Sequence, residues 1–169
     1  MTEEKYLRSL GAWDCRQDNP HHIYTVGEHT EKAVAWCKAH GASDDVIRAA
    51  WLHDCGKMQT RVRRLKRGAW IDTFYGHAEA SARLAEQFGE SPYVVKLIRY
   101  HDIAIGTPSD ATLRKLAANG RQWCEDLALL MQADLAAQHP TYQVAEKAKA
   151  KEACLQRLFE AVAEYEHGT

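Results

Sequence analysis

The sequence predicts an all-α fold, a compact helical bundle with a small β-hairpin near residues 60–74. Apolar residues recur over most of the chain at the i, i+3, i+4, i+7 spacing of amphipathic helices. Its 169 residues suit one domain with a buried core, and 46% hydrophobic with 27% charged residues is ordinary for a globular protein. We therefore expect a single domain over residues 1–169, with its core at 20–138 and a C-terminal amphipathic helix at about 140–166.

Two helices are predicted before the hairpin. The first covers "VGEHTEKAVAWCKAHG" and ends at Gly41, since glycine commonly follows a helix C-terminus. The second, "SDDVIRAAWLHD", begins at Ser43, an N-cap residue followed by two acids that favour a helix N-terminus, and Gly56 interrupts it. The next segment, "TRVRRLKRGAWIDTFYG", has β-branched and aromatic residues on both sides of "KRG", which predicts the hairpin.

Five further helices are predicted after the hairpin. The helix "HAEASARLAEQFG" ends at Gly89, and "SPYVVKLIRYHD" places Pro92 at an early helical position, where proline is favoured. The last three are the short "SDATLRKLAANG", the long and apolar "RQWCEDLALLMQADLAAQH", and the amphipathic "TYQVAEKAKAKEACLQRLFEAVAEYEH".

Composition excludes several classes of protein. A net charge of -1 is not that of a general nucleic-acid binder. Five cysteines without a CxxC pair exclude a disulfide framework and a cysteine-type zinc site, and scattered thiols suit a reducing compartment. The N-terminus is polar, and no run approaches the roughly 18 apolar residues of a membrane span. We therefore expect a cytoplasmic protein with no membrane partner.

Five of the predicted helices carry a His or Asp on an apolar stripe. Asp54 is the clearest case, because it continues the stripe of Ile47 and Trp51 and has His53 beside it. A lone inward His is more often a hydrogen-bonded core residue than a ligand. A buried carboxylate without a partner costs several kcal/mol, however, and no Lys or Arg shares the stripe of Asp54 or Asp134. The residues concerned are His29, His53, Asp54, His77, His101 and Asp134.

If these side chains converge, one or two cations would satisfy all of them together. Imidazoles and carboxylates without thiolates suit Mn, Fe, Ni, Co or Zn, and the set exceeds the four ligands of a closed tetrahedral site. We therefore expect one or two divalent transition metal ions, with Asp54 as the bridge if there are two. Two such ions can hold a phosphate and lower the pKa of a bound water.

These residues resemble the HD-domain superfamily of metal-dependent phosphohydrolases. Its pattern is H…HD…D with two added histidines in the extended form, and its positions are matched in order by His29, His53, Asp54, His77, His101 and Asp134. The resemblance covers residues 20 to about 138, and "NPHHIYTVGEHT", "WLHDCGK" and "FYGHAEASA" are most similar to the HD domain of bacterial tRNA nucleotidyltransferases. Those enzymes carry a polymerase head before the HD domain. Since only 28 residues precede His29, we expect a free-standing HD protein that does not add nucleotides to tRNA.

The resemblance implies an enzyme, a phosphohydrolase in which a metal-activated water attacks phosphorus. The full ligand set is similar to that of the binuclear members, including small diadenosine tetraphosphate hydrolases. The implied substrate is small and phosphorylated, a nucleotide or a small phosphodiester or phosphomonoester, and no stable complex with nucleic acid is expected. Two alternatives remain. One is a di-iron HD oxygenase, and the other is an HD module that binds a nucleotide or RNA without turnover.

Basic residues that follow the HD pair are candidate substrate contacts. Lys57, in "HDCGK", would serve catalysis by holding a phosphate or the bound water; the alternative is a solvated lysine at a helix end. Arg61, Arg63 and Arg64 would bind phosphates through bidentate hydrogen bonds, unless they belong to a solvated hairpin. Strand alternation places Arg61 and Arg63 on one face and Arg64 on the other, so not all can serve.

Three other polar residues lie close to the pattern. Asp102 follows His101 and would orient it, as carboxylates behind metal ligands do; the alternative is an acid that faces water. His21 and His22 precede the first ligand helix, and we expect them in a surface loop.

Overall fold

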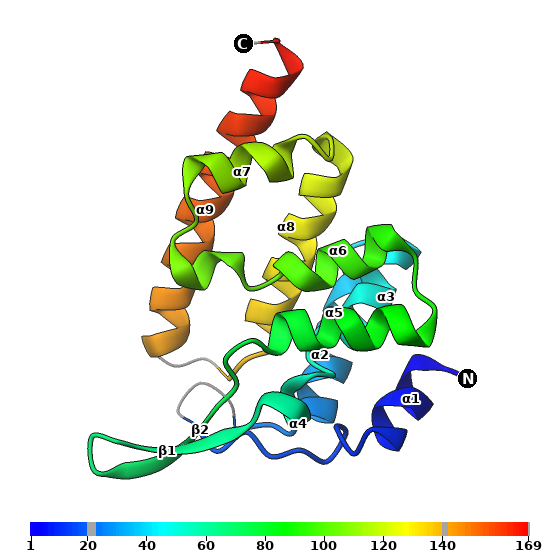
Figure 1. The fold of residues 1–169 in the computed structure, drawn as a ribbon, viewed down its shortest axis with the longest axis vertical. Helices are drawn as coiled ribbons and strands as arrows, with labels where there is room; N and C mark the ends of the chain where they lie inside the picture. Colours follow the sequence, from blue (N-terminus) through cyan, green and yellow to red (C-terminus); the bar gives the residue numbers. More distant parts are fainter. Residues whose placement is uncertain (20–22, 140–141, 169) are drawn as a thin grey trace.

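The computed structural model describes residues 1–19, 23–139 and 142–168 and, at residues 142–144, the backbone alone. His21 and His22 lie outside the described residues. The fold is all-α with one small β-hairpin, as predicted (Figure 1). In chain order the elements are α1 (Glu3–Ser9), α2 (Val26–Ala39), α3 (Asp44–Leu52), α4 (Lys57–Thr60), β1 (Val62–Lys66), β2 (Ala69–Thr73), α5 (His77–Phe88), α6 (Pro92–Tyr100), the 3-10 helix η1 (Ile103–Gly106), α7 (Asp110–Ala117), α8 (Arg121–Ala136) and α9 (Tyr142–Glu166).

Capping side chains fix where α2, α3 and α6 begin. At the start of α2, Thr25 Oγ1 accepts a hydrogen bond from Glu28 N at 3.1 Å, and the Glu28 carboxylate accepts one from Thr25 N at 2.8 Å. Ser43 Oγ accepts a hydrogen bond from Val46 N at the start of α3, and Ser91 Oγ accepts one from Val94 N at the start of α6, where Pro92 lies in the first turn. Local sequence therefore sets where three of the helices that surround the site begin.

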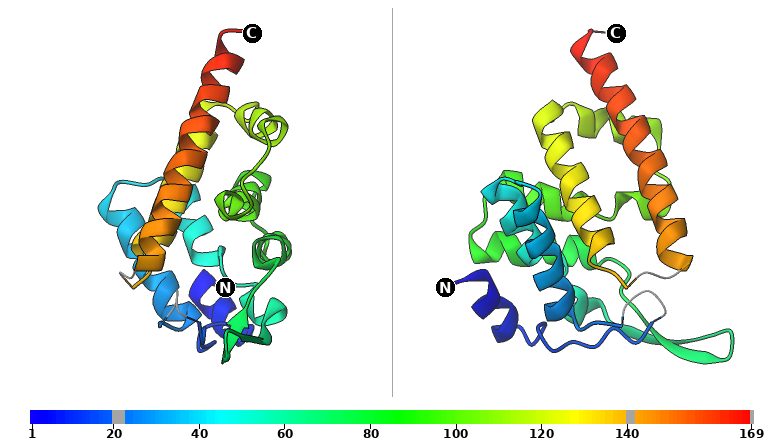
Figure 2. Two further views of the ribbon diagram at one scale, coloured as in Figure 1. Left: turned by 90° about the vertical axis from the view of Figure 1, so that its left-hand side faces the viewer. Right: turned by 180° about the vertical axis from the view of Figure 1, so that it is seen from behind.

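Helix α8 lies at the centre of the bundle. It packs against α2, α3 and α6 on one side, and α9 runs antiparallel along its other side (Figure 2). The core between these helices is formed by fully buried side chains, among them Leu52, Leu97, Ile98, Leu127 and Met131. No described helix is both long and apolar enough to cross a membrane.

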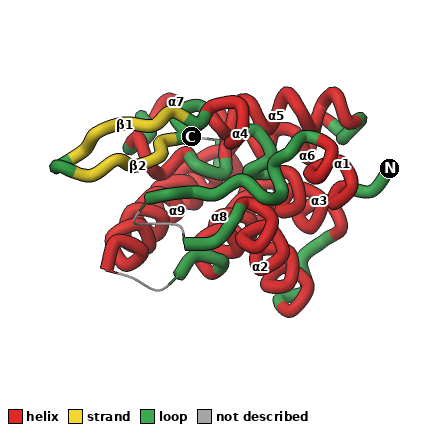
Figure 3. The backbone as a smooth tube through the Cα atoms, turned by 90° about the horizontal axis from the view of Figure 1, so that it is seen from below, coloured by secondary structure: helices red, strands yellow, loops and turns green. Residues whose placement is uncertain are grey.

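The hairpin projects from one end of the bundle (Figures 1 and 3). Strand β1 pairs antiparallel with β2, and Arg67 and Gly68 form the turn between them with positive φ angles of 50° and 79°. Two successive positive φ angles give the turn that matches the twist of a two-residue hairpin. Asp72 anchors the base, because it is buried and its backbone N donates to Asp18 O at 2.9 Å.

Candidate metal centre

The structure brings all six predicted ligands together in the interior of the bundle. They lie on five elements: His29 in α2, His53 and Asp54 directly after α3, His77 at the start of α5, His101 directly after α6, and Asp134 in α8. The expectation that each lies within a helix is wrong for the HD pair and for His101, because α3 ends at Leu52 and α6 at Tyr100.

Because they lie at helix ends or beside a turn, His53, His77 and His101 each place their ring against a nearby backbone carbonyl. Carbonyls in the last turn of a helix lack an intrahelical partner and remain available as acceptors. His53 Nδ1 lies 2.7 Å from Ala50 O, and His101 Nδ1 lies 2.7 Å from Ile98 O. His77 uses the same spacing of three residues, with Nδ1 2.9 Å from Phe74 O. Each of these rings is therefore oriented by the carbonyl three residues before it.

These contacts also determine which ring nitrogen carries the proton. A carbonyl oxygen only accepts hydrogen bonds, so Nδ1 is the donor and Nε2 of the neutral ring keeps its lone pair. His29 differs, because its Nδ1 is 3.4 Å from Ala137 O while its Nε2 is 3.0 Å from the Asp134 carboxylate, which is also an acceptor. When their rings are neutral, His53, His77 and His101 therefore present Nε2 lone pairs toward the interior, as metal-binding histidines do.

The first donor set combines His29, His53, Asp54 and Asp134. The Nε2 atoms of His29 and His53 are 3.2 Å apart, and Asp134 Oδ1 lies 3.0 Å from His29 Nε2. Asp54 Oδ2 is 3.4 Å from His29 Nε2 and 3.5 Å from His53 Nε2. Ligands that are about 2.0–2.2 Å from one metal lie roughly 2.8–3.6 Å from one another at octahedral or tetrahedral angles. The spacing in this set agrees with that range.

The second donor set combines Asp54, His77 and His101. The Nε2 atoms of His77 and His101 are 3.3 Å apart. Asp54 Oδ1 is 3.2 Å from His77 Nε2 and 3.8 Å from His101 Nε2. Asp102 Oδ2 lies 3.3 Å from His77 Nε2, so it faces His77 directly. From the sequence we expected Asp102 to orient His101 instead.

The donor chemistry in both sets fits bound cations. Two Nε2 atoms that face each other at 3.2 or 3.3 Å can hydrogen bond only if one of them carries a proton, whereas a metal ion can accept the lone pairs of both. The buried Asp54 Oδ2 makes no hydrogen bond of acceptable geometry among the described residues. Asp54 turns Oδ2 to the first set and Oδ1 to the second, so cations held by the two sets would share this carboxylate.

Comparison with known families agrees with this geometry. The model of the HD domain matches residues 21–164, which is most of the chain. The chain belongs to the HD-domain family. The match extends past Asp134 into α9, beyond the limit of about 138 that we inferred from the motif. A comparison with curated protein sequences finds no match.

Two lysines contact the carboxylates of the HD centre, as we name the two donor sets together. Lys57 is buried, and its Nζ lies 2.7 Å from Asp54 Oδ2 and 2.6 Å from Gln17 Oε1. Lys151, also buried, has its Nζ 2.6 Å from Asp134 Oδ2 and 3.1 Å from Met131 O. Both lysines come from other helices, α4 and α9, which explains why the stripes of α3 and α8 contain no cation. The solvated alternative for Lys57 is wrong, because its ammonium group lies inside the protein.

The charges within the HD centre shift the pKa values of its members. Burial alone would raise the pKa of Asp54, but Lys57 and His53 hold it well below its usual value. Burial acts in the same way on Asp134, and Lys151 and the neighbouring imidazoles again lower its pKa. Burial lowers the pKa of His101 to about 4. Both carboxylates are therefore ionised and His101 is neutral at neutral pH, the states in which these groups bind metal.

The contacts of the hairpin arginines are with residues other than the six predicted ligands. Arg61 binds the buried Asp72 carboxylate at 2.8 Å, and Arg63 Nη1 is 3.5 Å from Asp18 and 3.7 Å from Asp72. Arg64 extends to the other side and donates to Thr73 Oγ1 at 3.2 Å. This division matches the predicted alternation. The arginines therefore hold the base of the hairpin, and their contact with substrate stays a prediction.

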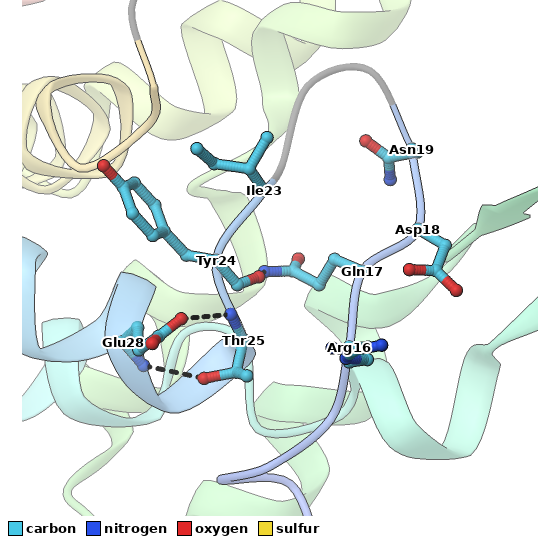
Figure 4. Close-up of a pocket in the computed structure, with 8 residues that line it drawn as sticks. All are labelled: Arg16, Gln17, Asp18, Asn19, Ile23, Tyr24, Thr25 and Glu28. Carbon is cyan, nitrogen blue, oxygen red and sulfur yellow. Dashed lines mark hydrogen bonds between the residues drawn. The ribbon is translucent and has the colours of Figure 1, made fainter.

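A cavity of about 500 Å³ lies along the segment that precedes α2 (Figure 4). Its lining consists of Arg16, Gln17, Asp18, Asn19, Ile23, Tyr24, Thr25 and Glu28. Gln17 connects the lining of this cavity with the HD centre, since its Nε2 donates to Tyr24 O at 3.1 Å while its Oε1 accepts from Lys57. Sequence reasoning missed Gln17, because a glutamine in an irregular segment carries no periodic signal.

Proposed function

We propose that the protein is a metal-dependent phosphohydrolase that acts on a nucleotide or on another small phosphodiester or phosphomonoester. The observation that supports this most is the position of Asp54, with one carboxylate oxygen at each of two imidazole-containing donor sets. Divalent ions held there would neutralise phosphoryl charge and lower the pKa of a bound water. Membership of the HD-domain family, which consists largely of such hydrolases, supports the same reaction class.

The protein's own residues would prepare the centre for this chemistry. The carbonyls that bind each Nδ1 hold the imidazoles in orientation before any ion arrives, so little reorganisation is needed. Lys57 holds a positive charge against Asp54 inside the protein, and we propose that it helps to offset the charge of the phosphoryl group. Full burial of His29 and His53 keeps bulk water from that side of the reaction.

A substrate panel tests the proposal. The purified protein would be loaded in turn with Mn, Fe, Ni, Co and Zn and assayed against nucleotides, dinucleoside polyphosphates, cyclic nucleotides and simple phosphomonoesters. We expect metal-dependent release of phosphate or of a nucleotide from at least one class, and loss of that activity in His53→Ala. A protein that holds metal but hydrolyses no member of the panel would contradict the proposal. Oxygen uptake with the iron-loaded protein would point to the oxygenase alternative.

A further inference from the structure

The described side chains at the HD centre differ in how much of them solvent reaches. Its deepest members are fully buried, namely His29, His53, Asp54 and His101. Asp134, His77 and Asp102 instead leave 8%, 13% and 21% of their side chains exposed. A substrate that reaches the centre would therefore approach past these three residues, whose side we call the open side.

Helix α9 brings two lysines to this side. Lys151 is held against Asp134 at 2.6 Å, and Lys147 lies four residues earlier on the same helix. Residues at i and i+4 share one helix face, so Lys147 projects from the face that covers Asp134. Lys147 is half-buried, whereas Lys149 on the opposite face is exposed and pairs with Glu146. The two lysines therefore extend the positive charge of α9 across the open side.

The ammonium group of Lys147 is only weakly engaged. Its Nζ donates to Gln138 Oε1 at 3.4 Å, and in the described part of the chain no carboxylate lies within ion-pair distance of it. An ammonium group has three hydrogens to donate. Burial lowers its pKa, and so do Lys57 and Lys151, whereas the carboxylates of Asp134 and Asp102 oppose that effect. A half-buried cation with spare donors beside an open site suits an anionic ligand.

We propose that Lys147 binds the phosphoryl group of the substrate at the open side of the HD centre, while Lys151 holds Asp134 in place. The inference rests on the proposed function, because it assigns a binding residue to that same site. The ligand class is a phosphate ester with at least one negatively charged, exposed phosphoryl group. Lys147 acts by direct contact with the anion, and Lys151 acts through Asp134 as a positioning residue.

Substitution of Lys147 tests the inference, with Lys149→Ala as the matched control on the same helix. In manganese-loaded protein, Lys147→Ala should weaken binding of inorganic phosphate, measured by titration calorimetry, by roughly tenfold to a hundredfold. The KM for a substrate found in the panel should rise by a similar factor, and Lys147→Arg should recover part of the loss. Metal content and melting temperature should stay as in the parent, and Lys149→Ala should match the parent in every measurement.

The possible failures are distinguishable. If the parent hydrolyses a phosphate ester but Lys147→Ala keeps its KM and its phosphate affinity, this inference is overturned and the proposed function stands. If Lys147→Ala loses metal or melts at a lower temperature, Lys147 has a structural role and the inference is also overturned. If the metal-loaded parent neither hydrolyses a phosphate ester nor binds phosphate, both the inference and the proposed function fail.

Discussion

At the scale of single residues, the two oxygens of Asp54 have different surroundings. Oδ2 faces His29, His53 and Lys57, and Oδ1 faces His77 and His101. One carboxylate thus joins two groups of imidazoles that have no other shared member. The lysine at 2.7 Å compensates its charge in the metal-free protein.

Asp54→Asn removes this charge and nearly keeps the shape. We expect weaker binding of metal at both positions and a loss of hydrolysis of about a hundredfold or more. In chelator the variant should lose about 1–3 kcal/mol of unfolding free energy, because the buried Lys57 then faces a neutral amide. Metal analysis, activity assays and chemical denaturation measure these effects. Asp126→Asn is the control, since Asp126 is buried on α8 with Tyr93 and Gln122 and should keep full metal content.

Lys151→Met should behave differently with and without metal. Without metal, Asp134 loses the lysine that pairs with it at 2.6 Å and its buried charge is poorly compensated, so we expect a loss of about 3–5 kcal/mol of unfolding free energy in chelator. With manganese bound, the ion takes over part of this compensation and the loss should shrink. Denaturation in both conditions gives the two values. Equal losses would mean that Lys151 supports packing rather than the charge of Asp134.

At the scale of elements, the HD turn between α3 and α4 packs directly against α5. Gly56 makes this approach possible, because a Cβ at this position would overlap the backbone of Ser81 and would lie 2.7 Å from the carbonyl carbon of Ala80. The Gly56 N also donates to Ser81 Oγ at 2.9 Å. This contact sets the distance between Asp54, on the turn, and His77, at the start of α5.

Gly56→Ala should therefore affect stability and metal binding together. We expect a loss of at least about 1–3 kcal/mol, since backbone atoms cannot move aside as a flexible side chain can. Metal content should fall mainly at the position that includes His77, as measured by elemental analysis. Gly106→Ala is the matched control, because nothing lies within 4 Å of its Cβ position. A Gly56→Ala protein as stable as this control would contradict the packing argument.

At the scale of the whole molecule, sequence patterns predicted the helices, the hairpin and the ligands. Long amphipathic segments such as α2 and α8 carry strong periodicity, and Asp54 and Asp134 stand out because carboxylates are costly on apolar stripes. The short helices α1 and α4 were not predicted, since 7 and 4 residues carry little periodic signal. The motif thus identified which residues converge.

The long-range contacts of the centre could not be predicted in the same way. The pairing of Gln17 with Lys57 depends on how distant segments fold together. Lys151 does follow a pattern in the sequence, because it extends the buried stripe of Cys154 and Leu158 along α9. A lysine on a buried stripe needs an anionic partner as much as an aspartate needs a cationic one.

We propose that one chain holds two metal ions that share Asp54. The most direct measurement is the number of ions per chain, by elemental analysis after manganese loading and removal of free metal, in the parent and in His77→Ala. The account predicts about two ions in the parent and about one in His77→Ala, because only the second donor set includes His77. A parent without bound metal, or a His77→Ala protein with as many ions as the parent, would contradict it.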